Sequence, residues 1–439
     1  TRTLLIGAAA AGAMASIFKA PIAAIVFAVE IFSLELTMAS LIPLLLASIT
    51  AVLTSYFFFG DDVLLHFSLQ DTFDFKDVIF YILLGVISAT VSIYFSKVYF
   101  KIDTLFKSIT NLYKRLLVGG ILLGVIIYFM PPLFGEGYET INNVLRGNID
   151  SVIVNNIFHI ATDNIWVIVV LLVGLILFKI VATSVTFGAG GVGGVFGPTL
   201  FTGSITGYVF ALVINYTNLF THQLSLTNFA MVGMAGLMAG ILHAPLTAIF
   251  LIAEITGGYE LFVPLMIVAS ISYLITKKYI PHNIYHKELA ERGQLLTHDR
   301  DKNVLMLMDI DKVIETNFIL LTPEMKLGEI VDNAVAKSSR NHFPVVSKEN
   351  EFLGIITLDD IRSIMFDTSL YDKVNVSGLM HSVPDIIDYD KDSMEVIMKK
   401  FKTTVAWNLP VIKDGKYFGF ISKSRLLTAY RRKLIHVTA

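Results

Sequence analysis

Between Ile165 and Ile275 the chain carries only three charged residues, Lys179, Glu254 and Glu260. Soluble domains average about one charged residue in four, whereas the interior of a bilayer disfavours charge because ions are costly to dehydrate. The whole chain shows the same bias, with 54% hydrophobic and 16% charged residues. We therefore predict that this part of the chain is embedded in a membrane.

Several of the apolar segments are shorter than the roughly 20 residues that a full membrane span needs. Short helices interrupted by glycine or proline are typical of proteins whose broken helices line a polar cavity. The predicted helices are Leu41–Phe58, Val78–Phe95, Leu116–Phe129, Ile165–Val185, Pro198–Ile214, Phe229–Ile241, Pro245–Ile255 and Leu261–Ile275. Residues 59–77 and 135–151 are expected to be polar connections between them.

An internal repeat indicates two related halves. Residues 11–31 match residues 235–255 at a constant offset of 224, and eleven of the 21 positions are identical, including Glu30 and Glu254. Two-fold internal repeats are common in transporters and channels. Because both halves carry the glutamate, we expect it to cap or brace a helix rather than relay protons. The first-half counterpart of the loop that ends at Pro198 is expected upstream of Thr1.

The loop at residues 188–197 contains six glycines and precedes Pro198, which begins another apolar segment. Proline suits the first turn of a helix, glycine lets an ion approach the backbone, and the unpaired amides of a helix start attract anions. This pattern predicts an anion site at residues 194–198, although helix packing is an alternative. For the glycines of "GSITG" (203–207), close helix packing is the preferred interpretation.

Beyond Tyr285 the composition becomes that of a soluble protein. Residues 343–361 are echoed by residues 409–426, each with a strand, a turn, a second strand with a glycine, and a helix. Amphipathic helices are predicted before them, at 326–338 and 393–404. We therefore expect two copies of one α/β module after the membrane region.

Together, "GGVFGP", the repeated "AP…E" helices and the paired modules resemble the CLC family of chloride channels and proton-coupled chloride transporters, many of which carry a CBS pair. The resemblance implies a polytopic α-helical membrane protein with inverted repeats and a missing N-terminal part, followed by an α/β CBS pair. The implied domains are a membrane domain at 1–285, a linker at 286–305 and CBS modules at 306–370 and 371–439.

The resemblance also assigns roles to residues of the anion site. It implies that the amides of Val195 and Phe196 bind a central chloride and that Phe196 and Gly197 face an outer site, with Gly194 and Pro198 completing the motif. The family further uses a tyrosine hydroxyl at the position of Tyr285, for which an interfacial anchor is the alternative. The family's central serine and gating glutamate are expected upstream of the given sequence.

The coupling of chloride to protons stays open at this point. Exchangers of the family often carry a second glutamate immediately after the position of Glu30, whereas this chain has Ile31, which cannot hold a proton. A proton-coupled exchanger with another proton route and a passive chloride channel both remain candidates. A CBS-regulated cation channel is disfavoured, because the membrane region has almost no carboxylates for its pore.

The CBS resemblance implies a site for ATP, ADP or AMP at Thr357 and Asp360. In the second copy Ser422 is followed at the same spacing by Arg425, which cannot accept hydrogen bonds from a ribose. A purely structural, dimer-forming role is the alternative. We further expect a homodimer in a lipid bilayer, in a bacterial inner membrane with the CBS modules cytoplasmic, and neither a nucleic-acid partner nor a required cofactor.

No motif of an enzyme active site is present, and the absence of cysteine excludes disulfides and thiolate chemistry. His282 and His286 have the spacing of metal ligands on a helix, but no third ligand is evident, so no metal site is predicted. Lys179 is expected to snorkel, with attraction of anions as the alternative.

Overall fold

A computed structural model describes residues 2–34, 36–60, 65, 73–154, 164–217, 222–291, 304–306 and 308–438. The chain divides into two compact units, residues 1–292 and 293–439. Each unit is described by itself. Most of the predicted linker at 286–305 lies outside the described residues.

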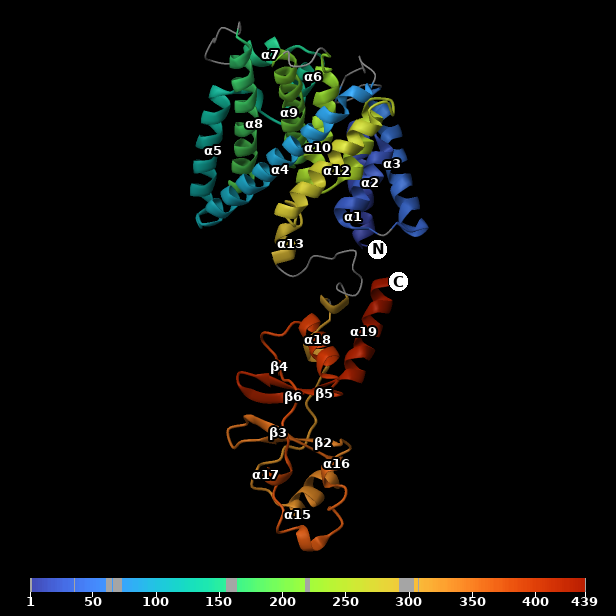
Figure 1. The fold of residues 1–439 in the computed structure, drawn as a ribbon, viewed down its shortest axis with the longest axis vertical. Coiled ribbons are helices and arrows are strands. Elements are labelled where there is room, and N and C mark those ends of the chain that lie inside the picture. Colours follow the sequence, from blue (N-terminus) through green and yellow to red (C-terminus); the bar gives the residue numbers. More distant parts are fainter. Residues whose placement is uncertain are drawn as a thin grey trace. The chain divides into compact units, whose positions relative to one another are not determined.

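The first unit is helical (Figure 1). Its helices are α1 (Arg2–Phe18), α2 (Pro21–Phe32), α3 (Met38–Phe59), α4 (Val78–Lys107), α5 (Leu112–Phe129), α6 (Tyr138–Leu145), α7 (Ile149–Val154), α8 (Ile165–Gly188), α9 (Phe196–Thr217), α10 (Leu226–Leu242), α11 (Pro245–Ile255), α12 (Phe262–Tyr279) and α13 (Lys287–Glu291). The eight apolar helices expected from the sequence are confirmed.

Within the described residues, six helices are long and apolar enough to cross a membrane: α3, α4 with the turn before it, α5, α8, α9 and α12. Four others, α1, α2, α10 and α11, are apolar but shorter than a span. This mixture is the one that the sequence predicted, and it places helix ends inside the membrane unit.

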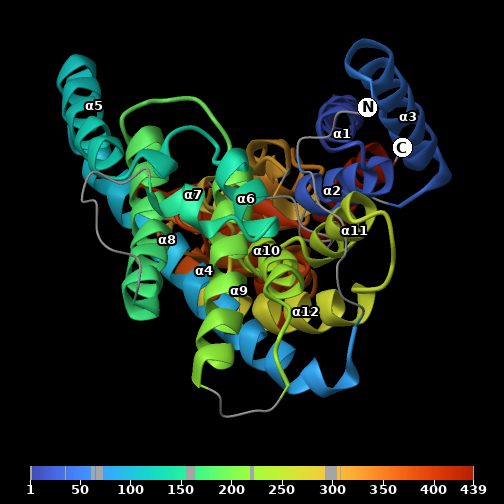
Figure 2. The ribbon, with the colours of Figure 1, turned by 90° about the horizontal axis from the view of Figure 1, so that it is seen from above.

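The centre of the unit is built on α9 and α10, which pack side by side (Figure 2). A methyl group added to Gly207 of α9 would lie 1.9 Å from the carbonyl oxygen of Phe229, and one added to Gly203 would lie 2.6 Å from Met234 Cα. The helices therefore contact each other through their backbones, and the packing interpretation of these glycines is confirmed.

The sequence repeat corresponds to a repeated pair of helices, α1–α2 and α10–α11. Pro21 and Pro245 occupy the first turns of α2 and α11. The carboxylate of Glu30, in α2, accepts hydrogen bonds from the amides at the start of α11, and that of Glu254, in α11, accepts from the amides at the start of α2. The bracing role expected for the two glutamates is confirmed.

One prediction was wrong in part. Residues 135–151, expected to be a polar connection, contain the short helix α6 and the first residues of α7. Ile141, Val144 and Leu145 of α6 are buried, because their spacing of three and four residues places them on one helix face that packs against α9 and α10.

The second unit contains two small sheets. Strands β2 (His342–Val346) and β3 (Phe352–Thr357) form an antiparallel pair. The larger sheet has the order β1-β6-β5-β4, in which only β4 and β5 run parallel. Its strands are β1 (Ile314–Glu315), β4 (Ile387–Asp388), β5 (Asn408–Lys413) and β6 (Lys416–Ser422).

The two predicted modules are visible in this unit. The pair β2–β3 is followed by α16 (Leu358–Ile361), and β5–β6 by α19 (Lys423–Thr438). The expected preceding helices are present as α15 (Leu327–Glu329) with a π-helical turn, and α18 (Met394–Thr404). The short α17 (Val376–Leu379) lies between the two repeats. Each copy has its own hydrophobic core.

Candidate functional site

The glycine loop turns the chain from α8 into α9. At its start the amides of Gly190 and Gly191 donate to the carbonyls of Phe187 and Thr186, which close the C-terminus of α8. Gly190 has a φ of +99°, a conformation that favours glycine. The loop then enters α9 at Val195, which is buried.

The first turn of α9 leaves amides unbound. The Val195 carbonyl accepts hydrogen bonds from the Thr199 amide and hydroxyl at 2.9 and 2.7 Å, so Val195 is the N-cap. Among the residues described, the amides of Phe196 and Gly197 donate to no protein group. These two amides carry the partial positive charge of the helix start, and an anion would satisfy them.

Tyr285 lies at the same place although it is far away in the sequence. Its hydroxyl lies beside the Val195 amide, and the side chain is 40% exposed. The segment is held by Asn283, which is buried and donates to the Leu242 carbonyl at 2.7 Å. The structure thus brings Tyr285 to the predicted loop, as the site hypothesis requires.

The first copy of the repeat contributes aromatic rings to the surroundings of Phe196. Its ring centroid lies 5.2 Å from that of Phe18 in α1 and 6.2 Å from that of Phe27 in α2. Phe18 also contacts Tyr138 edge-on, at the start of α6. The beginning of α9 therefore packs against aromatic rings of α1 and α2.

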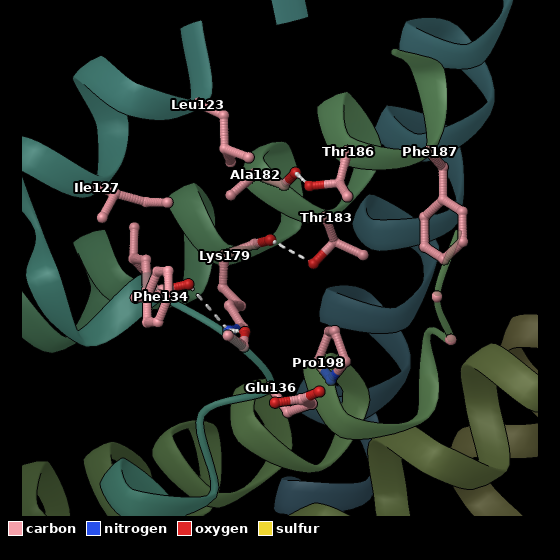
Figure 3. A pocket seen from close by; sticks show the side chains of 14 residues that line it. Leu123, Ile127, Phe134, Glu136, Lys179, Ala182, Thr183, Thr186, Phe187 and Pro198 are labelled. Atoms are coloured by element: carbon pink, nitrogen blue, oxygen red, sulfur yellow. Dashed lines mark hydrogen bonds between the residues drawn. The ribbon is translucent and has the colours of Figure 1, made fainter. Parts of the chain in front are cut away.

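A cavity of about 260 Å³ adjoins this helix start (Figure 3). Its wall includes Lys179 and Thr183 of α8, Glu136 of the loop before α6, and Gly194 and Pro198 of the anion motif. The hydroxyl of Thr183 donates to the Lys179 carbonyl and is not free to bind a ligand as a donor. The charged side chains of its wall are Lys179 and Glu136.

Lys179 does not snorkel, so that expectation was wrong. The side chain is 2% exposed, and its ammonium donates to the carbonyl oxygens of Leu133 at 3.2 Å and Gly135 at 2.7 Å. The ring of Phe201 lies 4.7 Å away. A buried ammonium is tolerated here because the loop before α6 brings carbonyls to it.

His282 and His286 do not gain a third ligand in the part of the chain that the structure describes. The Nε2 atom of His286 lies 2.8 Å from the carbonyl oxygen of Ile31, at the C-terminal end of α2. This contact ties the segment after Tyr285 to the first half of the repeat, which the sequence did not suggest.

In the second unit Thr357 and Asp360 lie together. The Asp360 carboxylate accepts from both the amide and the hydroxyl of Thr357, each at 2.7 Å, and caps α16. In the second copy Arg425 lies 3.5 Å from Glu315, which also pairs with Arg340 at 2.5 Å. Arg425, which differs from the residue expected for a nucleotide site, therefore belongs to a charge cluster with Glu315 and Arg340.

Residues 1–277 match the family model described as "Voltage gated chloride channel", and residues 309–367 match the CBS domain. A putative chloride channel protein ClcB-like from Ralstonia nicotianae is 29% identical over 289 residues, covering 65% of this chain and 63% of that protein. The voltage-gated ClC-type chloride channel ClcB of Escherichia coli is 27% identical over 292 residues, covering 66% and 65%. The chain thus spans just under two thirds of these relatives.

Solved structures share the fold. A slow cyanobacterial Cl⁻/H⁺ antiporter superposes with a TM-score of 0.55 at 23% identity, over 66% of this chain and 64% of that one. A eukaryotic CLC transporter gives a TM-score of 0.53 at 17% identity, over 96% and 70%. At these identities the likeness establishes the fold alone.

Proposed function

Because its residues 1–277 match the voltage gated chloride channel family, the chain belongs to that family, and we propose that it moves chloride across a membrane through a site at the start of α9. The observation that carries the proposal is the pair of unbound amides at Phe196 and Gly197, beside the Tyr285 hydroxyl. Neutral dipoles suit transport because the ion must also leave.

Chloride flux from liposomes that contain the full-length protein tests this site. Tyr285→Phe removes a hydroxyl that would donate to the ion, and a hydrogen bond to a charged group contributes about 1.5–3 kcal/mol. We expect the half-saturating chloride concentration to rise about tenfold, and Phe196→Ala to change it as well. Tyr279→Phe, an exposed tyrosine at the end of α12, is the matched control. Unchanged flux at both site positions would reject the proposal.

A chloride site of this kind is compatible with both proton-coupled exchange and passive conduction. Ile31, in place of a second carboxylate, favours the passive channel as the second candidate. The reversal potential in opposed chloride and pH gradients separates the two, because coupling to protons moves it away from the chloride equilibrium potential. A potential that follows chloride alone would establish the channel.

For the second unit, we propose that residues 371–439 form a second CBS module that pairs with the first, and that the pair binds ATP, ADP or AMP at Thr357 and Asp360. Engagement of Arg425 by Glu315 supports one site rather than two. Calorimetry on residues 293–439 tests it. Thr357→Ala is expected to weaken binding about tenfold, and Ser422→Ala to leave it unchanged. If residues 293–439 bind none of the three nucleotides, the CBS pair has a purely structural role.

We propose a homodimer in a bacterial inner membrane with the CBS pair in the cytoplasm. Apolar side chains of α2, α3, α11 and α12 are exposed within the unit, as a lipid or subunit contact requires. Cross-linking of the full-length protein in native membranes, with accessibility labelling of the tail, tests both points.

A further inference from the structure

The ammonium of Lys179 fixes the loop that precedes α6. It is one of the largest fully buried side chains of the described residues, and it donates to the carbonyls of Leu133 and Gly135. Breaking these hydrogen bonds would leave a buried charge without partners, which costs several kcal/mol. The position of the loop is therefore coupled to Lys179.

The loop also fits closely against α9. Gly135 and Gly137 have φ values of +64° and +92°, which side-chain-bearing residues rarely adopt. A methyl group on Gly137 would lie 2.4 Å from Cδ2 of Phe201, one turn inside α9. Phe201 is the ring that faces the Lys179 ammonium, so the lysine, the loop and the helix form one packed unit.

Glu136, between these two glycines, is placed over the first turn of α9. A methyl group on Gly197 would lie 3.2 Å from Glu136 Cβ and 3.5 Å from its Cγ. Figure 3 shows the Glu136 side chain beside Pro198, across the cavity from Thr183. An acidic side chain thus contacts the turn whose amides at Phe196 and Gly197 are unbound.

We propose that Glu136 sets the anion affinity of this helix start and that Lys179 is the positioning residue that holds it there. The inference rests on the proposed chloride site. A carboxylate beside a helix N-terminus is stabilised by the helix dipole, and it repels or competes with an anion for the same amides. The native affinity is therefore kept low enough for the ion to be released, as turnover requires.

Chloride binding to the full-length protein in detergent, measured by calorimetry, tests the role of Glu136. Glu136→Gln removes one negative charge beside the site and is expected to tighten chloride binding about five-fold. Glu139→Gln, an exposed glutamate three residues on, is the matched control and is expected to stay within two-fold of the wild type. Equal affinities for both variants would overturn the inference. Absence of chloride binding by the wild type would instead reject the proposed function.

A double-mutant cycle tests the positioning role. If Lys179 holds the loop, Glu136→Gln changes affinity less than two-fold in a Lys179→Met background, because the carboxylate no longer contacts the helix start. Where Lys179→Met does not fold, Gly137→Ala displaces the same loop against Phe201 and serves as the background. An undiminished five-fold effect in the Lys179→Met background would show that Lys179 does not position Glu136, and the same result in the Gly137→Ala background would show that the position of the loop does not set the effect of Glu136.

Discussion

Glu30 and Glu254 each cap the first turn of the helix that carries the other. The Glu30 carboxylate accepts from the amides of Leu246 and Thr247 at 3.0 and 2.8 Å and from the Thr247 hydroxyl at 2.6 Å. The Glu254 carboxylate accepts from the amides of Ile22 and Ala23 at 3.1 and 2.7 Å. The two halves of the repeat are thus joined by reciprocal caps.

Removing either cap should destabilise the membrane unit. Each carboxylate satisfies helix-start amides that would otherwise be left without partners, so Glu254→Ala is expected to cost about 1–3 kcal/mol. Glu30→Ala should cost more, because it also releases the Thr247 hydroxyl. Thermal unfolding of the purified protein in detergent measures both. Glu260→Ala, in the exposed turn before α12, is the control, and equal melting temperatures for all three variants would contradict the capping role.

The repeat in the sequence predicted that these glutamates have structural roles, but not that each serves the opposite half. Identity at a fixed offset shows that two segments have the same local structure. It contains no information on how the copies face each other, which is decided by packing across the unit. That Tyr285 lies near residues 194–198 was expected only from the family resemblance, for the same reason.

Gly207 should be intolerant of any side chain. The space for a Cβ atom is occupied by the Phe229 carbonyl oxygen at 1.9 Å, and backbone cannot move aside as a flexible side chain can. Gly207→Ala is expected to lower the free energy of unfolding by about 1–3 kcal/mol through overpacking of α9 against α10. Gly124→Ala in α5 meets nothing within 4 Å and should change it by at most about 1 kcal/mol. Similar losses of stability for Gly207→Ala and Gly124→Ala, measured by thermal unfolding in detergent, would argue against backbone contact between α9 and α10.

The charged residues of the membrane unit were harder to predict than its helices. Helix positions follow from runs of apolar residues, a local property. The burial of Lys179 depends on carbonyls of a loop more than forty residues away, which no local pattern contains. Likewise, α6 was missed because its polar residues dominate the composition, whereas its buried stripe of Ile141, Val144 and Leu145 is only three residues wide.

Glu315 should be the most sensitive acidic residue of the second unit. Its side chain is 9% exposed and lies between Arg340 and Arg425. Glu315→Gln leaves both guanidinium groups without their anionic partner, so we expect a loss of about 1–2 kcal/mol in the free energy of unfolding of residues 293–439, measured in urea. Glu324→Gln, which removes an exposed partner of Lys348, should cost less than about 0.5 kcal/mol. A larger loss of stability for Glu324→Gln than for Glu315→Gln would show that the cluster of Glu315, Arg340 and Arg425 contributes nothing to stability.

His342 should make the second unit acid-sensitive. Burial lowers the pKa of His342 below its ordinary value of 6.5, although the nearby carboxylates of Asp359 and Asp360 oppose the shift. Below about pH 6.5 the unfolded chain takes up a proton on His342 that the folded chain resists. The free energy of unfolding therefore falls as the pH drops from about 7 through 6.5 toward the folded pKa. At pH values well above 6.5 this histidine has no effect on stability. Melting of residues 293–439 between pH 7.5 and about 5.5 measures this loss.

The substitution His342→Gln should reduce this loss, because glutamine binds no proton in either state while its amide can still reach Asn408, the neighbour of the His342 ring at 3.3 Å. His381→Gln is the control, since that imidazole is half-exposed. The control should retain the full acid loss. If His342→Gln melts with the same pH dependence as the wild type, the acid sensitivity arises elsewhere, and the burial of His342 does not resist protonation.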